Sequence, residues 1–238
     1  MDKTISDFQE KVLKALAGRI EDFYLVGGTA LSLYYLKHRA SQDLDFFTRE
    51  FSQKIIDEIV KYLSDALKKK IILKAKQTRE GFVRVAVYSI PMNKRYSLKV
   101  DFVEDYVGLI KPPKDINGIK VASLEDIYIK KIYAITGAST VEDSAGRKIA
   151  GGNREEAKDF FDLYCLSHIF LRLSEFSFKY GSPVIREGIV RWFRTYNRSE
   201  MKTGLLELEL KKAIDYNDME RHFKKEIAGI IEKEVGPE

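Results

Sequence analysis

The sequence contains very little cysteine and histidine. Among its 238 residues there are three histidines and one cysteine, Cys165. A single cysteine excludes an intramolecular disulfide, and the scattered histidines leave no cluster of the kind that binds zinc. These absences exclude disulfide-stapled secreted domains and zinc proteins, and the composition fits a reducing cytoplasm best.

Long apolar runs are also missing. No stretch approaches the roughly 20 apolar residues of a membrane-spanning helix. The N-terminal segment MDKTISDFQEKVLKALAGRI is charged and amphipathic, and it lacks the uninterrupted apolar core of a signal peptide. The chain has no internal repeat, no low-complexity tract and no long linker. We therefore expect a soluble, unexported protein with no membrane partner.

Charged residues, in contrast, are abundant, and their balance is slightly basic. They make up 32% of the chain, and 41 basic against 36 acidic residues give a net charge of +5 and a pI near 9.0. This balance is compatible with a polyanionic partner such as nucleic acid. A charged surface that only keeps the protein in solution explains it equally well.

The apolar pattern divides the chain into two halves. In the first half, helical spacing predicts helices, and apolar alternation predicts strands. The expected helices are 5–16, 29–36 and 52–68, and the expected strands are 23–26, 43–48, 71–77, 81–90 and 96–103. After KPPKDINGIK the pattern becomes almost entirely helical, with helices expected at 124–136, 154–170, 183–196 and 218–234. We predict a boundary near Pro112 and Pro113, between an α/β half (1–111) and a helical half (112–238). The pattern leaves open whether these are two domains or one fold with a helical cap.

Two acids interrupt the apolar strand 43–48. Residues two apart in a strand point to the same side, so Asp43 and Asp45 share a face, while Leu44 and Phe46 point to the opposite face. Two close carboxylates repel each other unless a cation neutralises them. Mg²⁺ does this well, because it prefers oxygen ligands and keeps positions open for phosphates. The alternative is a solvated strand face that happens to be acidic.

A third acid, Asp101, lies in the strand 96–103 between the apolar residues Val100 and Phe102. If this strand lies beside that of Asp43, three carboxylates converge. Such a cluster can hold one or two divalent ions for in-line phosphoryl or nucleotidyl displacement. Lys99 shares a face with Asp101, and an ion pair between them competes directly with a metal role.

A glycine pair precedes the acids. Gly27 and Gly28 stand between a predicted strand and a predicted helix, where glycine lets the backbone approach a ligand closely. The first amides of that helix and the hydroxyl of Thr29, which we expect at the N-cap, form an anion site. Strand-to-helix turns often need glycine for backbone reasons alone, so the acids downstream give the pair its meaning.

The order Gly27-Gly28-Thr29, Asp43-Leu44-Asp45 and Asp101 resembles the pattern of the polymerase-β-like nucleotidyltransferase superfamily. The closer resemblance is to the AbiEii/AbiGii family of toxin-type nucleotidyltransferases. It rests on GGTALSLYYL, on Arg39-Ala40-Ser41 and on DLDFF, in that order. Two helical motifs extend it, one from Glu125 to Ile135 with the family lysine at Lys131, and one from Lys158 to Tyr164 that contains Asp159 and Asp162. The resemblance covers about residues 23–166.

The resemblance implies an α+β fold, with a nucleotidyltransferase-like mixed sheet, flanking helices and a C-terminal helical domain that completes the active site. It implies Mg²⁺-dependent or Mn²⁺-dependent transfer of a nucleotide monophosphate from an NTP to an acceptor hydroxyl, with release of pyrophosphate. The acceptor in the family is often a tRNA 3′ end, and the protein is the toxin of a toxin–antitoxin pair. NTP, tRNA and a cognate antitoxin protein are therefore the partners that the resemblance implies.

Individual roles follow from the same resemblance. Asp43 and Asp45 would hold the metal, and Asp101 would hold metal or act as a base. Nucleotide binding falls to Gly27, Gly28, Thr29, Arg39, Ser41 and Lys131. Lys131 would neutralise the triphosphate, and Asp159 would orient this lysine or take a proton from the attacking hydroxyl.

Plainer interpretations remain beside these roles. Arg39 can be an ordinary surface arginine, and Ser41 a turn residue. Asp159 and Asp162, three apart on a helix, can lie on a solvated face with ordinary salt bridges. His38 has no evident partner, Cys165 is expected in the core, and Trp192, Phe193 and Tyr196 are expected to pack helices together. The acceptor can also be a protein or a small molecule, or the chain can be a catalytically silent module of the same fold that binds RNA or protein.

Overall fold

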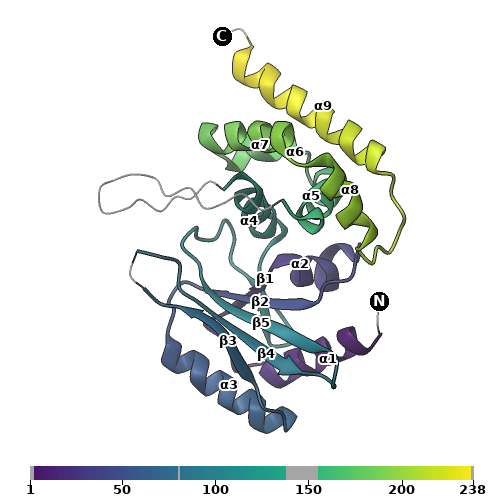
Figure 1. Cartoon of the computed structure of the whole chain (residues 1–238). Helices are drawn as coiled ribbons and strands as arrows, with labels where there is room; N and C mark the ends of the chain where they lie inside the picture. The colour runs from purple at the N-terminus through teal and green to yellow at the C-terminus, as the bar shows by residue number, and fades with distance from the viewer. Residues whose placement is uncertain (1–2, 80, 138–154, 237–238) are drawn as a thin grey trace. The chain divides into compact units, whose positions relative to one another are not determined.

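The computed structural model describes residues 3–79, 81–137 and 155–236. The chain forms two compact units (Figure 1). The first unit comprises Met1–Tyr35 and Ala40–Asp126, and the second comprises Leu36–Arg39 and Ile127–Glu238. Four residues from the N-terminal half of the sequence thus fold with the C-terminal half.

The first unit is built on a mixed sheet. Within the described residues this sheet has seven strands in the order β3-β4-β5-β2-β1-β7-β6. The strands are β1 (Tyr24–Val26), β2 (Asp43–Thr48), β3 (Ile72–Gln77), β4 (Val85–Pro91), β5 (Ser97–Glu104), β6 (Lys114–Ile116) and β7 (Ile119–Val121). The pairs β2/β5 and β1/β7 are parallel, and the other neighbours are antiparallel. The predicted mixed sheet is confirmed.

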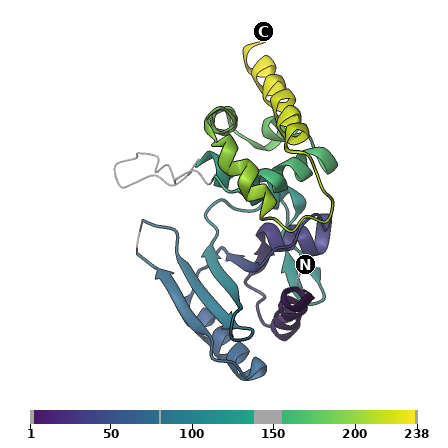
Figure 2. The same ribbon diagram turned by 45° about the vertical axis from the view of Figure 1, so that its right-hand side comes forward.

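Two long helices, α1 (Lys3–Leu16) and α3 (Gln53–Leu67), lie along one face of this sheet (Figures 1 and 2). Alternation along β2 buries Leu44 and Phe46 completely on the helix-covered side. α3 begins where the Ser52 hydroxyl accepts a hydrogen bond from the amide of Ile55, and it ends at Lys68 in the left-handed conformation. The helix-covered face is therefore the core of the unit, and the acids lie on the opposite face.

The Gly-Gly turn starts a short α2 (Gly27–Ala30), which continues as the π-helix η1 (Leu31–Leu36). The prediction that Thr29 caps this helix is wrong. Val26 occupies the N-cap, and no side chain caps the helix end, because the helix begins two residues earlier than the apolar pattern indicates. Thr29 is instead fully buried.

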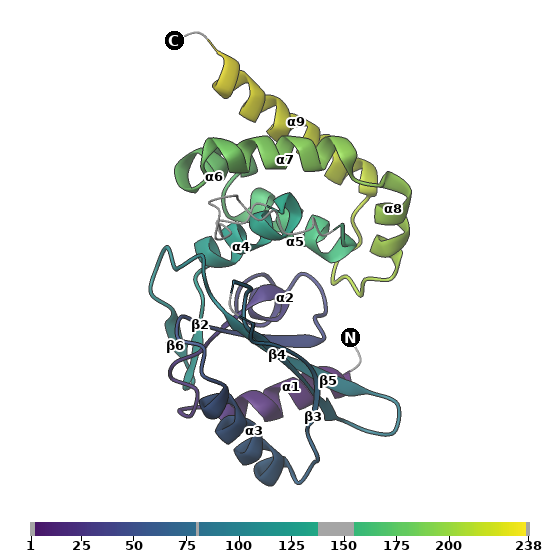
Figure 3. The ribbon, with the colours of Figure 1, turned by 60° about the vertical axis from the view of Figure 1, so that its left-hand side comes forward.

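The second unit is helical. Its helices are α4 (Leu124–Thr136), which starts in the first unit, α5 (Ala157–Ile169), α6 (Leu173–Tyr180), α7 (Pro183–Thr195), α8 (Arg198–Leu206) and α9 (Tyr216–Val235). Figure 3 shows α6 and α7 beside α9. Phe160, Trp192, Tyr196 and Phe223 form a buried aromatic cluster between α5, α7 and α9. The predicted packing role of Trp192, Phe193 and Tyr196 and the core position of Cys165 are confirmed.

The two compact units meet after Asp126, and the boundary near Pro112 and Pro113 between two domains stays a prediction. Residues 112–126 contain β6 and β7, and β7 joins the sheet because Leu25 of β1 pairs with Val121. In the described part of the chain, no helix is long and apolar enough to cross a membrane.

Candidate active site

The pairing of β2 with β5 brings the predicted acids onto one face of the sheet. Asp45 lies opposite Asp101, and Asp43 lies opposite Lys99. On the other face, Leu44 pairs with Val100 and Phe46 with Phe102, and all four side chains are buried. The two strands are thus direct neighbours, which is the condition that the sequence leaves open.

Asp101 forms an ion pair with Lys99, and 2.6 Å separates the lysine Nζ from a carboxylate oxygen. Partial burial lowers the pKa of Lys99, but the hydrogen bond to Asp101 and the charges of Asp101, Asp43 and Asp45 outweigh burial and raise this pKa. In the structure, Asp101 therefore forms the ion pair that competes with a metal-binding role. Lys99 keeps its positive charge beside the three carboxylates.

The donor set determines which metal suits this face. Among the described residues, no three His, Cys, Asp or Glu side chains converge closely enough to form a metal site by themselves. Mg²⁺ does not need such a cage, because it commonly binds through one or two carboxylates together with water and substrate phosphates. Asp43 and Asp45, both half-buried on one face, fit that requirement. Asp101, opposite Asp45, is the third candidate ligand, and its ion pair with Lys99 competes with this role.

Gly27 lies directly against the Asp45 carboxylate. Its φ of +74° suits glycine, and a Cβ atom at this position would overlap the carboxylate of Asp45. Both demands exclude a side chain here. The Gly-Gly turn therefore serves a close approach between the backbone and a site carboxylate, which the sequence pattern indicates only in general terms.

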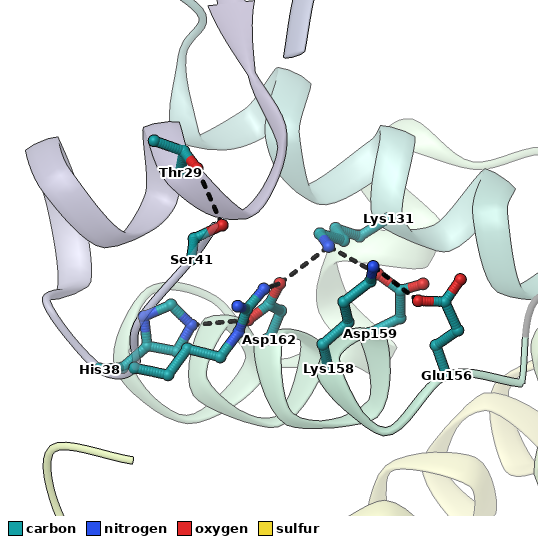
Figure 4. A network of polar contacts seen from close by, with 9 residues as sticks. Thr29, His38, Ser41, Lys131, Glu156, Lys158, Asp159 and Asp162 are labelled. Carbon is teal, nitrogen blue, oxygen red and sulfur yellow. Dashed lines mark hydrogen bonds and ion pairs between the residues drawn. The ribbon is translucent and has the colours of Figure 1, made fainter. Parts of the chain in front are cut away.

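Buried side chains hold the segment that enters β2. The Gln9 amide nitrogen donates to the carbonyl of Ser41 at 3.0 Å and approaches that of Asp43 at 3.5 Å. The Thr29 hydroxyl donates to the Asp43 carbonyl and lies 2.8 Å from the Ser41 hydroxyl (Figure 4). Gln9 and Thr29 are fully buried. The Thr29 hydroxyl thus bonds both to the Ser41 hydroxyl and to the backbone carbonyl of Asp43.

In the second unit, Lys131 bridges two buried aspartates of α5. Its Nζ lies 2.6 Å from Asp159 and 2.8 Å from Asp162 (Figure 4). Both aspartates are 0% exposed, so the interpretation as a solvated helix face is wrong. Burial lowers the pKa of Lys131, but the charges of Asp162 and Asp159 outweigh it and raise this pKa. Lys131 is thus held as a cation at a fixed place.

Two residues from the N-terminal half complete this network. Arg39 is buried and binds Asp162 through two hydrogen bonds, from Nε at 2.6 Å and from an Nη at 2.7 Å. His38, stacked on Phe161, brings Nε2 within 2.7 Å of Asp162. The view of Arg39 as a surface residue is wrong, and so is the expectation that His38 has no partner.

The backbone of this N-terminal segment is also held by the second unit. The amide of Lys211 donates to the His38 carbonyl at 2.9 Å, and Arg39 forms a β-bridge with Leu210.

Two cationic side chains, those of Lys131 and Arg39, contact Asp162. Burial raises its pKa, but the charges of Lys131 and Arg39 and the hydrogen bonds from His38 and Arg39 outweigh burial and hold this pKa well below the ordinary value.

The structure thus groups the predicted residues in two sets. The first unit contains Asp43, Asp45, Asp101, Gly27, Gly28, Thr29 and Ser41, and the second contains Arg39, Lys131 and Asp159. Sequence reasoning missed two positioning residues, Gln9 and His38. A glutamine on the buried side of α1 is the only signal for the first. The signal for the second is its place next to Arg39.

A sequence model of the family described as nucleotidyl transferase AbiEii toxin, type IV TA system, matches residues 11–236 of this chain. The chain is also 30% identical over 161 residues to the uncharacterised protein aq_aa25 of Aquifex aeolicus (strain VF5). This match covers 66% of the chain and 62% of the relative, so the chain spans less than two thirds of the length of that relative.

Two solved structures from Helicobacter pylori have a similar fold. One is a candidate nucleotidyltransferase, with a TM-score of 0.61 over 98% of this chain and 97% of that chain. The other is JHP933, with a TM-score of 0.57 over 98% and 96%. Both are 18% identical to this chain, which at that level supports the fold alone. Because the family model covers nearly the whole chain, this protein belongs to the AbiEii family of nucleotidyl transferase toxins of type IV toxin–antitoxin systems.

Proposed function

We propose that this chain transfers a nucleotide monophosphate from an NTP to an acceptor hydroxyl, in a reaction that depends on Mg²⁺ or Mn²⁺. Family membership supports the reaction class. The observation that carries the proposal is the alignment of Asp45 with Asp101 on neighbouring strands, with the Gly27 backbone against the Asp45 carboxylate. Phosphate-binding amides and metal-binding carboxylates would thus lie within one unit.

In the proposed reaction, the acceptor oxygen bonds to the α-phosphorus, and the bond from this phosphorus to the bridging oxygen of the β-phosphate breaks. Pyrophosphate leaves. The backbone amides of Gly28 and Thr29 would bind phosphate oxygens. Asp101 would accept the proton of the attacking hydroxyl once Lys99 moves off it, and Lys99 could then neutralise charge on the departing group.

Asp43 and Asp45 would hold the metal ion, and Asp101 is the third candidate ligand. When bound, the ion neutralises phosphate oxygens and orients the NTP for in-line attack. The acidic pair supplies oxygen donors only, which matches Mg²⁺ or Mn²⁺ and does not match zinc.

The second unit would complete the site, as a C-terminal helical domain, by binding the triphosphate. Lys131 would act as a point charge, with Asp159 and Asp162 fixing its position. Arg39 would contribute to nucleotide binding through the same network, because its guanidinium binds Asp162, which also binds Lys131. The two-domain organisation belongs to this proposal, with the boundary after Asp126 favoured by the contacts.

We further propose a tRNA 3′ end as the acceptor, in the cytoplasm where NTPs and tRNA occur together, and inhibition by a cognate antitoxin protein. Membership in a toxin family supports the antitoxin. The net charge of +5 is compatible with an RNA acceptor.

Label transfer tests the proposal. Each of the four NTPs, labelled at the α-phosphate, is incubated with the protein, Mg²⁺ and total tRNA, and the RNA is then examined for label. We expect one NTP to label the RNA. Asp43→Ala is expected to lower the rate at least about 100-fold, as removal of a metal ligand should. Asp65→Asn, which removes an exposed carboxylate of α3, is the matched control and should leave the rate unchanged.

Other outcomes separate the alternatives. Label that appears on a protein or a small molecule but not on RNA would remove tRNA as the acceptor and keep the reaction. Transfer that survives Asp43→Ala would refute the assignment of the carboxylates. A protein that binds RNA and transfers no label with any NTP is the silent module.

A further inference from the structure

The positive charge of the chain is concentrated in one segment. Residues 68–99 contain ten basic residues and a single acidic one, so this segment carries a net charge of +9. The whole chain carries +5, and the remaining residues therefore sum to −4. The segment runs through β3 and β4 into the start of β5. The excess of basic residues that gives the chain its high pI is thus located in one part of the first unit.

This side is the free edge of the sheet. β3 is the outermost strand, and its residues from Ile72 to Lys76 are all exposed. Lys69 donates to the Met92 carbonyl at 3.1 Å, which ties the loop before β3 to the turn between β4 and β5. The basic residues of the loop and of the turn therefore lie together at one end of this edge strand.

Within the part of the chain that the structure describes, most of these charges form no ion pair with a group of opposite sign. Arg84 is neutralised by Glu104, and Lys99 by Asp101. Six exposed side chains form no ion pair with any described residue, and we call them the basic edge: Lys68, Lys70, Lys74, Lys76, Lys94 and Arg95. Lysines on an edge strand also prevent strands of different molecules from pairing. That role accounts for Lys74 and Lys76 but not for the four residues in the loop and the turn.

Exposed aromatic rings accompany the charges. Tyr96 is 51% exposed beside Arg95, and Phe82 is 53% exposed, with the guanidinium of Arg79 5.6 Å from the centre of its ring. Aromatic and guanidinium groups next to a basic strip suit bases that stack and phosphates that follow one another along a chain. A solvated surface or an acidic protein does not need the two rings.

The basic edge is connected to the candidate site through the sheet itself. One row of side chains on the site face runs Ile72, Ser89, Lys99 and Asp43, and the next runs Ala75, Val87, Asp101 and Asp45. Neighbouring strands lie about 4.8 Å apart, so β3 is about 10 Å from β5 and about 14 Å from β2. A nucleic acid bound at the edge could therefore reach the carboxylates with its end.

We propose that the basic edge binds the phosphate backbone of an RNA and directs its end towards Asp43, Asp45 and Asp101. This inference deepens the proposed function and rests on it for the identity of the RNA as acceptor. RNA binding itself needs neither NTP nor metal, so it can be measured independently of transfer.

The test compares two variants with the same change of charge. The first carries Lys74→Glu, Lys76→Glu, Lys94→Glu and Arg95→Glu. The control carries Lys11→Glu, Lys54→Glu, Lys61→Glu and Lys225→Glu, at exposed positions outside the basic edge. Binding of fluorescent total tRNA, and of a fluorescent single-stranded RNA, is followed by anisotropy across a salt series without Mg²⁺ and NTP. A milder variant, Lys94→Ala with Arg95→Ala, serves if the fourfold variant fails to fold.

We expect the basic-edge variant to bind at least about 30-fold more weakly at about 100 mM salt, and the slope of log affinity against log salt to fall by about 3. The control should change affinity by less than about threefold. The milder variant should lose part of the affinity and lower the slope by about 1.5. In the transfer assay, the basic-edge variant should raise KM for RNA and leave KM for NTP unchanged.

Three results would overturn the proposal. The first is equal loss of binding in the basic-edge variant and the control, and the second is unchanged binding in the basic-edge variant. The third is a wild-type protein that binds neither RNA, which would favour an acidic protein as the partner of the basic edge. Asp43→Ala should keep RNA binding. If transfer fails in the wild type while RNA binding depends on the basic edge, the proposed function is wrong and the RNA surface stands.

Discussion

At the scale of single residues, Gly27 is constrained in two ways. Its left-handed backbone and its contact with the Asp45 carboxylate both require the absence of a side chain. Gly18 offers a matched comparison, because its φ is +70° and a Cβ there would meet nothing within 4 Å. The two glycines therefore separate backbone strain from crowding of the site.

We expect Gly18→Ala to lower the free energy of unfolding by about 1 kcal/mol, the cost of a left-handed alanine. Gly27→Ala should cost about 1 to 3 kcal/mol more, because the new methyl group displaces the Asp45 carboxylate or the turn. It should also abolish label transfer, whereas Gly18→Ala should retain it. Urea unfolding and the transfer assay measure both effects. Equal stabilities of the two variants would contradict the contact with Asp45.

Residues also show what the sequence could predict about the site. Asp43, Asp45 and Asp101 follow from strand alternation and from their place in a recognisable pattern. The ion pair between Lys99 and Asp101 was foreseeable as well, since both lie on one face of one strand. Gln9 and His38 were not, because their contacts join residues 32 and 124 positions apart, and no local pattern encodes such a distance.

At the scale of elements, helix α5 is unusual because it buries two aspartates on the side that faces Lys131. We expect Asp162→Asn to lower the free energy of unfolding at pH 7 by about 3 to 5 kcal/mol, because it leaves buried cations without their counter-charge. Asp65→Asn, on the exposed side of α3, should change it by less than about 0.5 kcal/mol.

The same substitution should alter the response to acid. The pKa of Asp162 is held below that of an unfolded aspartate, so the folded chain binds fewer protons at this site than the unfolded chain. The stabilisation is therefore complete above roughly pH 4, the unfolded value, and declines as pH falls through the folded value. Urea midpoints measured from pH 7 to pH 2 should converge for the wild type and Asp162→Asn. A constant difference down to pH 2 would contradict the depressed pKa.

Elements were predictable where their pattern is long or strictly periodic. Alternation predicted β2 residue for residue, and helical spacing predicted α3 and α7 to within one residue at each end. The strands β6 and β7, of three residues each, are too short to show a period, and the helices α6 and α8 were not predicted either. The predicted strand 81–90 begins only at Val85, because its first residues form a turn. Strand order depends on pairing between distant segments, which alternation does not encode.

At the scale of the whole molecule, the reactivity of the single cysteine measures whether the second unit is folded. Cys165 is 3% exposed, and burial, together with the charge of Asp162, raises the pKa of its thiol to about 12. At pH 8 only about one thiol in 10⁴ would be ionised, and a thiol reagent in solution would have little access to the buried sulfur. We expect a thiol reagent to react at least about 100-fold more slowly with the native protein than with the protein in concentrated urea. Rapid reaction of the native chain at pH 8 would contradict the buried position.

The assignment of residues 36–39 to the second unit has a consequence for biosynthesis. Arg39 leaves the ribosome 123 residues before Asp162. At about 5 to 20 residues per second, this interval lasts roughly 6 to 25 s. During this time the strands that carry Asp43, Asp45 and Asp101 can already pair. The side chains of Arg39 and His38 still lack their partner, the carboxylate of Asp162. The nascent chain is therefore cationic at this point until α5 emerges, and a truncated product that ends before α5 would keep that charge permanently exposed.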